Sequence, residues 1–309
     1  MDEIISVRNL TKSYGKIKAL DSVSLDIPEG VVALIGPNGS GKTTLINIVM
    51  GLVKPDVGEI SVFGFDPWRN GHLVRRLVNV LHEKPSFPKW FTGLEYLLYA
   101  ADLYGLSNPR DRVYEVASWL SIEKELNRRV GEYSAGMVQR LGLAQVLLNE
   151  PKLIILDEPT ANLDPAGRME VLNLVRELRR SKKVSFILSS HILPELGRVC
   201  DFLVLLHYGR LLIASDVKNL LSIQPPIEYR IISSDNRLLF DIGTRAGLSM
   251  ELCEDSVVLK AVDPDSLTNI LRLASDYGLK IKYVEPEKNI IETIYFSILK
   301  GERREGGYA

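Results

Sequence analysis

The chain has 309 residues, of which 46% are hydrophobic and 25% are charged, and this length and composition indicate a globular protein of about two domains. Its 38 lysines and arginines against 39 aspartates and glutamates give a formal net charge of −1, which argues against a broad nucleic-acid-binding surface. The two cysteines, Cys200 and Cys253, exclude a disulfide framework and fit neither zinc-binding nor redox spacing, so a reducing cytoplasm is the simplest compartment.

The first part of the chain is expected to be rich in strands. Strand-like stretches cover residues 4–7 and 19–27, and the second ends at the turn Pro28-Glu29-Gly30. The acidic start, Met1-Asp2-Glu3-Ile4, lacks the basic residues of a secretory signal, and no apolar run approaches the roughly 20 residues that span a bilayer. We therefore expect any membrane role to come through a partner.

A glycine-rich segment directly after the apolar run 31–35 carries the strongest chemical signal. Its consecutive backbone N–H groups can turn inward on phosphates, Lys42 adds a positive charge, and Thr43 offers a hydroxyl to Mg²⁺. The stretch 44–50 has helical spacing, which places the phosphates at a helix N-terminus. A structural glycine turn is the alternative. The pattern predicts binding of a nucleoside triphosphate by Gly36, Pro37, Asn38, Gly39, Ser40, Gly41, Lys42, Thr43 and Thr44.

The middle of the chain alternates between helical and strand-like patterns. Residues 85–150 have helical periodicity, which we interpret as a helical insertion. Apolar runs follow at 153–156, 184–188 and 202–206, with a helical stretch at 166–180. Short apolar strands with helices between them predict a mostly parallel sheet that is covered on both faces.

Two adjacent carboxylates end the apolar run 153–156. Asp157 at the strand end can hold Mg²⁺ through water, and Glu158 can face the γ-phosphate and polarise an attacking water. Because a buried carboxylate without a partner is costly, this pair favours a site over a core position. A solvated acidic turn is the alternative.

The break Gln224-Pro225-Pro226 predicts a domain boundary, with a nucleotide-binding domain at 1–222 and an accessory domain at 225–309. The order expected in the second domain is strand, helix, two strands, helix and strand, which is the ferredoxin-like βαββαβ arrangement. An amphipathic helix with an apolar stripe from Ile290 to Leu299 comes last. That stripe either packs on its own domain or binds a partner.

The segment Tyr133-Ser134-Ala135-Gly136-Met137-Val138-Gln139-Arg140-Leu141-Gly142-Leu143-Ala144 resembles the signature motif of the ATP-binding-cassette (ABC) ATPases. It lies just upstream of the carboxylate pair, as that family requires, and the resemblance covers about residues 4–220. It implies a P-loop α/β cassette with a mixed sheet, an N-terminal β-subdomain and a helical insertion at about 85–150, followed here by the small α+β ferredoxin-like domain. ATP is the nucleotide that it implies.

The resemblance also implies roles for residues outside the glycine-rich segment. Tyr14 would stack on adenine, a contact worth about 1–3 kcal/mol, although a core or turn tyrosine is the alternative. Ser134 and Gly136 open a helix and would face the γ-phosphate held by another subunit. Asp164 lies in the D-loop, and His191 would contact the γ-phosphate unless it is a hydrogen-bonded loop histidine. The expected catalytic residues are Lys42, Glu158 and His191.

The sequence departs from the family pattern at two places. The usual leucine, second glycine and glutamine of the signature are Tyr133, Ala135 and Met137, so the grip on the γ-phosphate is expected to differ. Glu83 aligns with the coupling glutamine and adds a carboxylate beside phosphates, unless it is a solvent-facing loop residue. The expected Mg²⁺ ligands are Thr43, Asp157 and Glu83.

Taken with the resemblance, these patterns predict the ATP-hydrolysing subunit of an ABC transporter. Its expected partners are a second nucleotide-binding subunit and a separate integral membrane permease of export type, without nucleic acid, and its expected place is peripheral, on the cytoplasmic face of the cell membrane. An aromatic-rich segment is expected either to form the permease groove or to pack as core. It includes Phe87, Trp90, Phe91, Leu94 and Tyr96.

Two other functions are weighed against this one. A soluble ABC ATPase acting on ribosomes or DNA resembles proteins with two cassettes or a long coiled coil, and the chain has neither feature. A regulatory role, in which the ferredoxin-like region senses a small molecule or dimerises to gate hydrolysis, is compatible with the transporter function.

Overall fold

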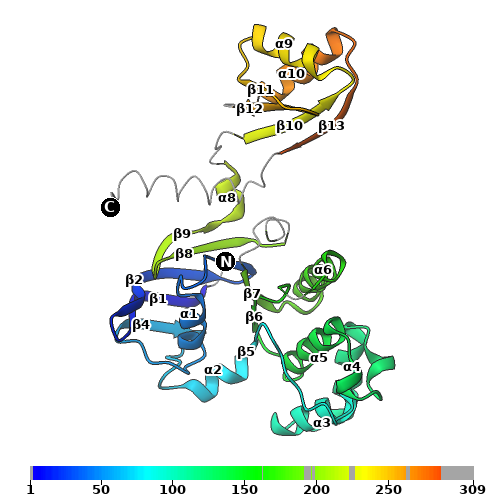
Figure 1. Ribbon diagram of the computed structural model, residues 1–309. Helices are drawn as coiled ribbons and strands as arrows, with labels where there is room; N and C mark the ends of the chain where they lie inside the picture. The colour runs from blue at the N-terminus through cyan, green and yellow to red at the C-terminus, as the bar shows by residue number, and fades with distance from the viewer. Residues whose placement is uncertain are drawn as a thin grey trace. The chain divides into compact units, whose positions relative to one another are not determined.

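The computed structural model describes residues 3–161, 163–190, 196, 199–222, 227–261 and 265–286. The chain forms two compact units, Met1–Asp216 and Val217–Ala309 (Figure 1). Within the described residues, no helix combines the length and the apolar character that crossing a bilayer requires.

Unit 1 begins with a three-stranded antiparallel sheet in the order β2-β1-β4. Its strands are β1 (Glu3–Tyr14), β2 (Ile17–Pro28) and β4 (Val57–Val62), of which the first two are longer than the sequence predicts. The tight turn between β1 and β2 uses Gly15 at φ +60°, a conformation that glycine adopts without steric cost. This sheet is the expected β-subdomain.

A six-stranded sheet forms the centre of unit 1, with the order β5-β6-β7-β3-β8-β9. The strands β5 (Val78–Leu81), β6 (Leu153–Asp157), β7 (Ser185–Ser190), β3 (Val31–Ile35) and β8 (Phe202–His207) run parallel to one another. Every residue of β3 is buried, as a parallel strand covered on both faces requires. The mostly parallel sheet is confirmed. The antiparallel edge strand β9 (Arg210–Asp216) was not foreseen.

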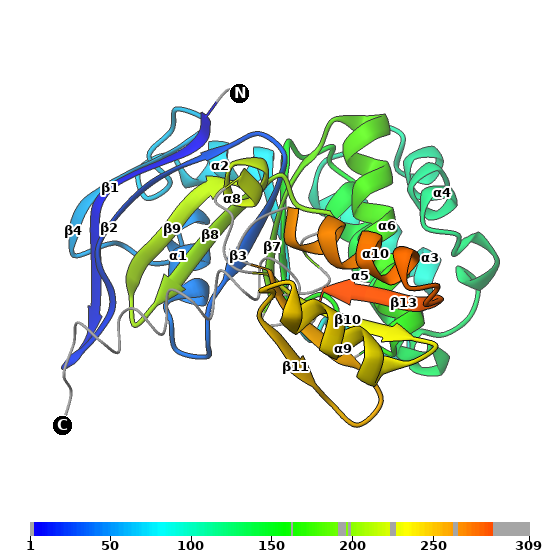
Figure 2. The same ribbon diagram turned by 90° about the horizontal axis from the view of Figure 1, so that it is seen from above.

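One hydrophobic core joins both sheets of unit 1. Apolar residues of α1 (Lys42–Val49) pack in the same cluster as residues of β1, β2, β3 and β4, and they include Leu45, Ile46, Ile48 and Val49. Helices α2 (Gly71–Leu77) and α6 (Pro165–Lys182) also belong to this unit (Figure 2). The shared core fixes the start of α1 against the sheet.

The helical insertion contains α3 (Gly93–Leu103), α4 (Pro109–Trp119) and α5 (Ala135–Leu147), with the short turns η1 (Glu123–Glu125) and η2 (Val130–Glu132) between the last two. Helix α3 begins with a capping box, in which Thr92 and Glu95 bond each other's backbone N–H groups. The inward faces of α3 and α4 are buried at Leu97, Ala101, Val113, Val116 and Ala117. The helical insertion is confirmed.

Unit 2 starts with α8 (Val217–Ser222), ahead of the break at 224–226. Strands β10 (Ile227–Ser233), β11 (Met250–Leu252), β12 (Val257–Ala261) and β13 (Ile281–Pro286) pair antiparallel in the order β11-β12-β10-β13. Helices α9 (Asn236–Arg245) and α10 (Asp265–Asp276) share a core with them. From β10 to β13 the connectivity is βαββαβ. The predicted final helix around 290–299 lies outside the described residues.

Parallel pairing brings several loops to one edge of the central sheet. Ile35 pairs with Ser190, Asp157 with Ser189, and Leu81 with Leu156, so β3, β5, β6 and β7 end at the same edge. Ligands of open α/β sheets bind outside the carboxyl ends of the strands.

Candidate functional site

The glycine-rich segment forms a tight loop between β3 and α1. Gly41 caps α1 with φ +106°, and a side chain there would collide with the carbonyl oxygen of Ala19. Gly36 is also hemmed in, because an added Cβ would meet the backbone of Leu206 and the side chain of Ser40. Asn38 and Gly39, at the tip, are exposed. The loop therefore packs closely at its base and is open at its tip.

Lys42 is 7% exposed and folds back onto this loop. Its Nζ donates to the carbonyl of Gly36 at 2.7 Å and to that of Pro37 at 3.2 Å. Burial lowers the pKa of Lys42, while the charges of Glu158 and Asp157 act in the opposite direction. The ammonium group is therefore held inside the loop and lies within the field of the carboxylate pair.

Asp157, Glu158 and Ser189 form one hydrogen-bonded group at the ends of β6 and β7. The Ser189 hydroxyl donates to Oδ1 of Asp157 at 2.6 Å and accepts the backbone N–H of Glu158 at 2.8 Å. Glu158 has φ +49°, in the left-handed region that residues other than glycine rarely adopt. Strain of this kind, which costs on the order of 1–3 kcal/mol, is found at functional sites. The acidic-turn alternative does not explain a fully buried serine that fixes both residues.

Ser189 was missed by the reading of the sequence. It follows an apolar run and directly precedes Ser190 and His191, so a hydroxyl at the end of a buried strand was the available signal. His191 itself lies outside the described residues, as does Asn162 in the expected D-loop.

Glu83 follows β5 at the same edge of the sheet. It is half-buried and forms an ion pair with Lys84, at 3.6 Å between Oε1 and Nζ. Its neighbour His82 lines a hollow of about 290 Å³ between α1, β5 and the helical insertion, together with Asn47, Tyr104 and Gln145.

The aromatic segment expected at a permease groove does not line that hollow. Phe87 and Tyr96 pack together with ring centroids 4.7 Å apart, and Tyr96 Oη bonds the side chain of Gln145 at 2.9 Å. Trp90 contacts Phe91 edge-on and remains 73% exposed, with Tyr99 53% exposed nearby on α3. The segment is thus partly packed and partly an exposed aromatic surface beside α3.

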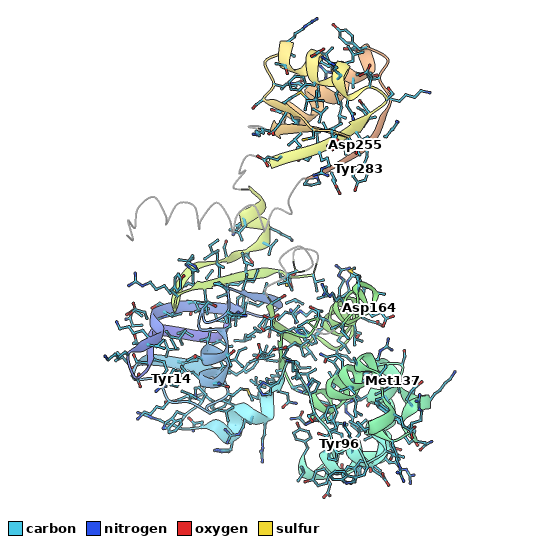
Figure 3. All side chains as sticks on the ribbon, viewed as in Figure 1. Tyr14, Tyr96, Met137, Asp164, Asp255 and Tyr283 are labelled. Carbon is cyan, nitrogen blue, oxygen red and sulfur yellow. The ribbon has the colours of Figure 1, made fainter. Side chains whose placement is uncertain are left out.

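Tyr14 ends β1 and is 49% exposed. This exposure excludes a core position, whereas the alternative of a turn tyrosine stays open because the turn at Gly15 follows directly. The Lys12 ammonium lies 5.6 Å from the Tyr14 ring centroid. Figure 3 shows Tyr14 on the β-subdomain side of unit 1, well apart from Met137 on α5 and Asp164 at α6. The residues attributed to adenine stacking and to the signature therefore lie on separate parts of the same unit.

The signature segment opens α5 as expected. Ser134 is the N-cap, and its Oγ accepts the backbone N–H of Met137 at 3.3 Å. Ser134 is exposed, and a side chain added at Gly136 would meet no atom within 4 Å. No close packing inside unit 1 therefore demands glycine at 136.

Tyr133 stands where the family usually has leucine, and its side chain points into the helical insertion. Its hydroxyl donates to the carbonyl of Glu125 at 2.7 Å and lies against Gly93 at the start of α3. Burial raises the pKa of Tyr133. The substitution thus anchors the signature loop to the helical insertion.

Asp164 is the N-cap of α6, where its Oδ1 accepts the backbone N–H of Gly167 at 2.9 Å. This cap fixes the direction in which α6 leaves the loop after Glu158.

The residues at the sheet edge fit a phosphate ligand. Helix α1 has no acidic residue in its first turn, so its positive end is not neutralised there. The Ser40 hydroxyl is buried beside Gly36 and has no hydrogen-bond partner among the described residues. The exposed Thr43 and the half-buried Asp157 supply the oxygen donors that Mg²⁺ prefers. Within the described part of the chain, no group of three or more His, Cys, Asp or Glu side chains lies together so that it could hold a metal ion.

Residues 20–161, which hold the loop, the signature and the carboxylate pair, match the family model described as ABC transporter. An uncharacterised ABC transporter ATP-binding protein, YxlF of Bacillus subtilis, is 41% identical over 67% of this chain and 69% of its own length. The bacitracin transport ATP-binding protein BcrA of Bacillus licheniformis is 37% identical over 69% of each chain.

A solved structure agrees with these relatives. The ADP conformation of an ATP-binding cassette of an ABC transporter has a TM-score of 0.65 and 29% identity, and the similarity covers 72% of this chain and 96% of that one. The predicted cassette fold is thereby confirmed.

Proposed function

Because the chain belongs to the ABC transporter family as an ATP-binding subunit that couples ATP hydrolysis to transport, we propose that it powers export through a separate membrane permease. Subunits of this family dimerise and work with membrane permeases. The observation that carries the proposal is the meeting of the Lys42 loop with Asp157, Glu158 and Ser189 at one sheet edge.

In the proposed nucleotide site, the loop 36–44 and the carboxylate pair have different roles. The loop 36–44 holds the phosphates of ATP, with the Lys42 ammonium leaving the carbonyls of Gly36 and Pro37 for phosphate oxygens. Tyr14 stacks on the adenine. The Glu158 carboxylate orients water for in-line attack on the γ-phosphate, with His191 beside it. Thr43 and Asp157, with Glu83 nearby, would hold Mg²⁺, which would supply positive charge beside the phosphates.

The site is proposed to be completed by a second nucleotide-binding subunit, the same chain or a different one. Ser134 keeps a hydroxyl proton for a phosphate while its oxygen caps α5, and Gly136 leaves open space beside it. Asp164 holds the D-loop end of α6 against the same interface. ATP would thus join the loop of one subunit to the signature of the other, and closure and reopening would drive the permease.

Hydrolysis is tested first in the purified full-length chain. Glu158→Gln should retain nucleotide binding, lower turnover by about 100-fold or more and accumulate an ATP-dependent dimer. Glu150→Gln is a matched control, because Glu150 also has a left-handed backbone, at φ +53°, but lies away from this edge. Unchanged turnover in the Glu158 variant would remove the proposed role of that residue.

The permease is tested by pull-down of the tagged chain from the membranes of its own host in gentle detergent, followed by mass spectrometry. A stoichiometric multi-span permease is expected, and it would place the chain on the cytoplasmic face as a peripheral subunit. Recovery of ribosomal or DNA-repair proteins without a permease would contradict the proposal. The aspartate variants of Trp90 and Tyr99, which are exposed on the surface beside α3, should weaken that association and leave ATP binding unchanged.

The accessory region 225–309 is proposed to act on the ATPase cycle. Its deletion should change the ATPase rate, the oligomeric state or transport. If all three stay unchanged, a regulatory role for this region is ruled out.

A further inference from the structure

Arg140 links three helices of unit 1. Its Nη2 donates to Oε2 of Glu170 on α6 at 2.6 Å, and its Nη1 donates to the carbonyl of Leu120 at the end of α4 at 2.9 Å. Arg140 lies in the second turn of α5, the helix that Ser134 and Gly136 open. A single side chain therefore ties the signature helix to the helix that begins at Asp164.

The space beside this link is poorly filled. A cavity of about 360 Å³ lies between α5 and α6. The signature helix contributes Gly136 and Arg140 to its lining, and α6 with the residue before its cap contributes Leu163, Gly167 and Glu170. Close packing normally holds helices in register, and this hollow, which opens to solvent, reduces the surface over which α5 and α6 can pack. Polar contacts therefore carry more of the relative placement of α5 and α6.

The C-terminal end of α6 is also held by polar contacts. Trp119 of α4 lines this cavity and a second one of similar volume, about 360 Å³. The Lys182 ammonium, at the end of α6, lies 3.9 Å from the Trp119 ring centroid and 3.9 Å from a Glu115 carboxylate oxygen. Lys182 thus holds the last turn of α6, and the Arg140 link holds its first half.

The Arg140–Glu170 pair is too exposed to contribute much to folding. The side chains are 32% and 62% exposed, and ion pairs at such sites stabilise proteins only slightly. Its geometric effect is larger, because a displacement of about 1 Å in a group that contacts the reacting substrate costs roughly 100-fold in rate. The pair is therefore suited to setting a position.

We propose that Arg140 is a positioning residue, which through Glu170 sets the signature helix against α6 so that Ser134, Gly136 and Asp164 reach the second subunit together. This inference rests on the proposed function, because it assumes that the closed dimer forms across the signature segment. The Arg140–Glu170 contact would decide how readily one subunit presents Ser134, Gly136 and Asp164 to the other.

The test uses the full-length chain in the Glu158→Gln background, with ATP and Mg²⁺, and measures the dimer fraction by analytical ultracentrifugation. Glu170→Arg sets two cations against each other and leaves the bond from Arg140 to Leu120 available. We expect it to raise the ATP concentration at half-maximal dimerisation by about tenfold. Adding Arg140→Glu to Glu170→Arg should recover part of the loss. Arg128→Glu removes an exposed ion pair with Glu132 within the helical insertion and should change nothing.

The outcomes separate this inference from the proposed function. If the Glu158→Gln chain itself does not dimerise with ATP, the proposed function fails first. If it dimerises and the Glu170→Arg variant does so at the same ATP concentration, Arg140 has no positioning role. A loss that the charge exchange does not reduce overturns the inference as well. So does an equal loss of melting temperature or of nucleotide affinity in the monomer, because either would show a structural role.

Discussion

The hydroxyl of Ser189 lies 2.6 Å from Oδ1 of Asp157 and joins the ends of two neighbouring parallel strands. The same oxygen accepts the N–H of Glu158 at 2.8 Å, so one buried side chain fixes the Asp157 carboxylate and the backbone of Glu158. Ser189→Ala should lower the free energy of unfolding by about 1–3 kcal/mol, because it leaves a partly buried N–H and a partly buried carboxylate oxygen without this partner. It should also lower the ATPase rate.

Ser185→Ala is the matched control for this change. Ser185 lies on the same strand, is equally buried, and its hydroxyl accepts a backbone N–H from Gly30 at 3.3 Å, at the opposite end of the strand from the site. Chemical denaturation should show a stability loss for both variants, whereas only Ser189→Ala should lose ATPase activity. Equal activity of the two variants would show that Ser189 does not act on the site.

Lys42→Ala should weaken nucleotide binding. A charge-assisted hydrogen bond contributes about 1.5–3 kcal/mol, so affinity for ATP is expected to fall roughly ten- to hundredfold. Calorimetric titration of the full chain measures this, with the exposed Lys89→Ala as the control. Full retention of ATP affinity would contradict the assignment of the loop as a phosphate site.

Glu83→Gln restores the amide that the family usually has at this position. If the carboxylate lies near the metal, its loss should raise the Mg²⁺ concentration for half-maximal hydrolysis several-fold. The measurement is a Mg²⁺ titration of ATPase activity at fixed ATP, next to Glu123→Gln, an exposed carboxylate of the helical insertion. An unshifted titration curve would identify Glu83 as a loop residue without contact to the metal.

The capping box of α3 should give a specific pH dependence. The Thr92 N–H donates to Oε2 of Glu95 at 2.8 Å, and this bond, followed by that of the Thr92 hydroxyl, lowers the pKa of Glu95 below its ordinary value of 4.5. A carboxylate with a lowered folded pKa stabilises the fold above its unfolded pKa, and this contribution is lost as pH falls through the folded pKa.

Glu95→Gln keeps a capping side chain and removes the titration. Melting temperatures of the two proteins should therefore differ at neutral pH and converge as pH falls below about 4.5, the unfolded value of a glutamate. A difference that stays constant across this range would show that the charge of Glu95 does not stabilise the cap.

Local patterns in the sequence were enough to identify the family, the loop at 36–44, the signature segment and the carboxylate pair. Backbone chemistry explains this result, because glycine spacing, a terminal cap such as Ser134 and an apolar run before Asp157 each act within a few residues. The same short-range rules located the helical insertion and the strands and helices between β10 and β13.

Long-range contacts were decided only by the tertiary structure. Ser189 is 32 residues from Asp157 and Glu170 is 30 from Arg140, and no local pattern encodes which side chain will meet which. The inward turn of Tyr133 depends on Gly93 leaving room for its hydroxyl, and the edge strand β9 depends on its pairing with β8. Strand order and helix packing choose these partners, because they place residues from distant parts of the chain within hydrogen-bond distance.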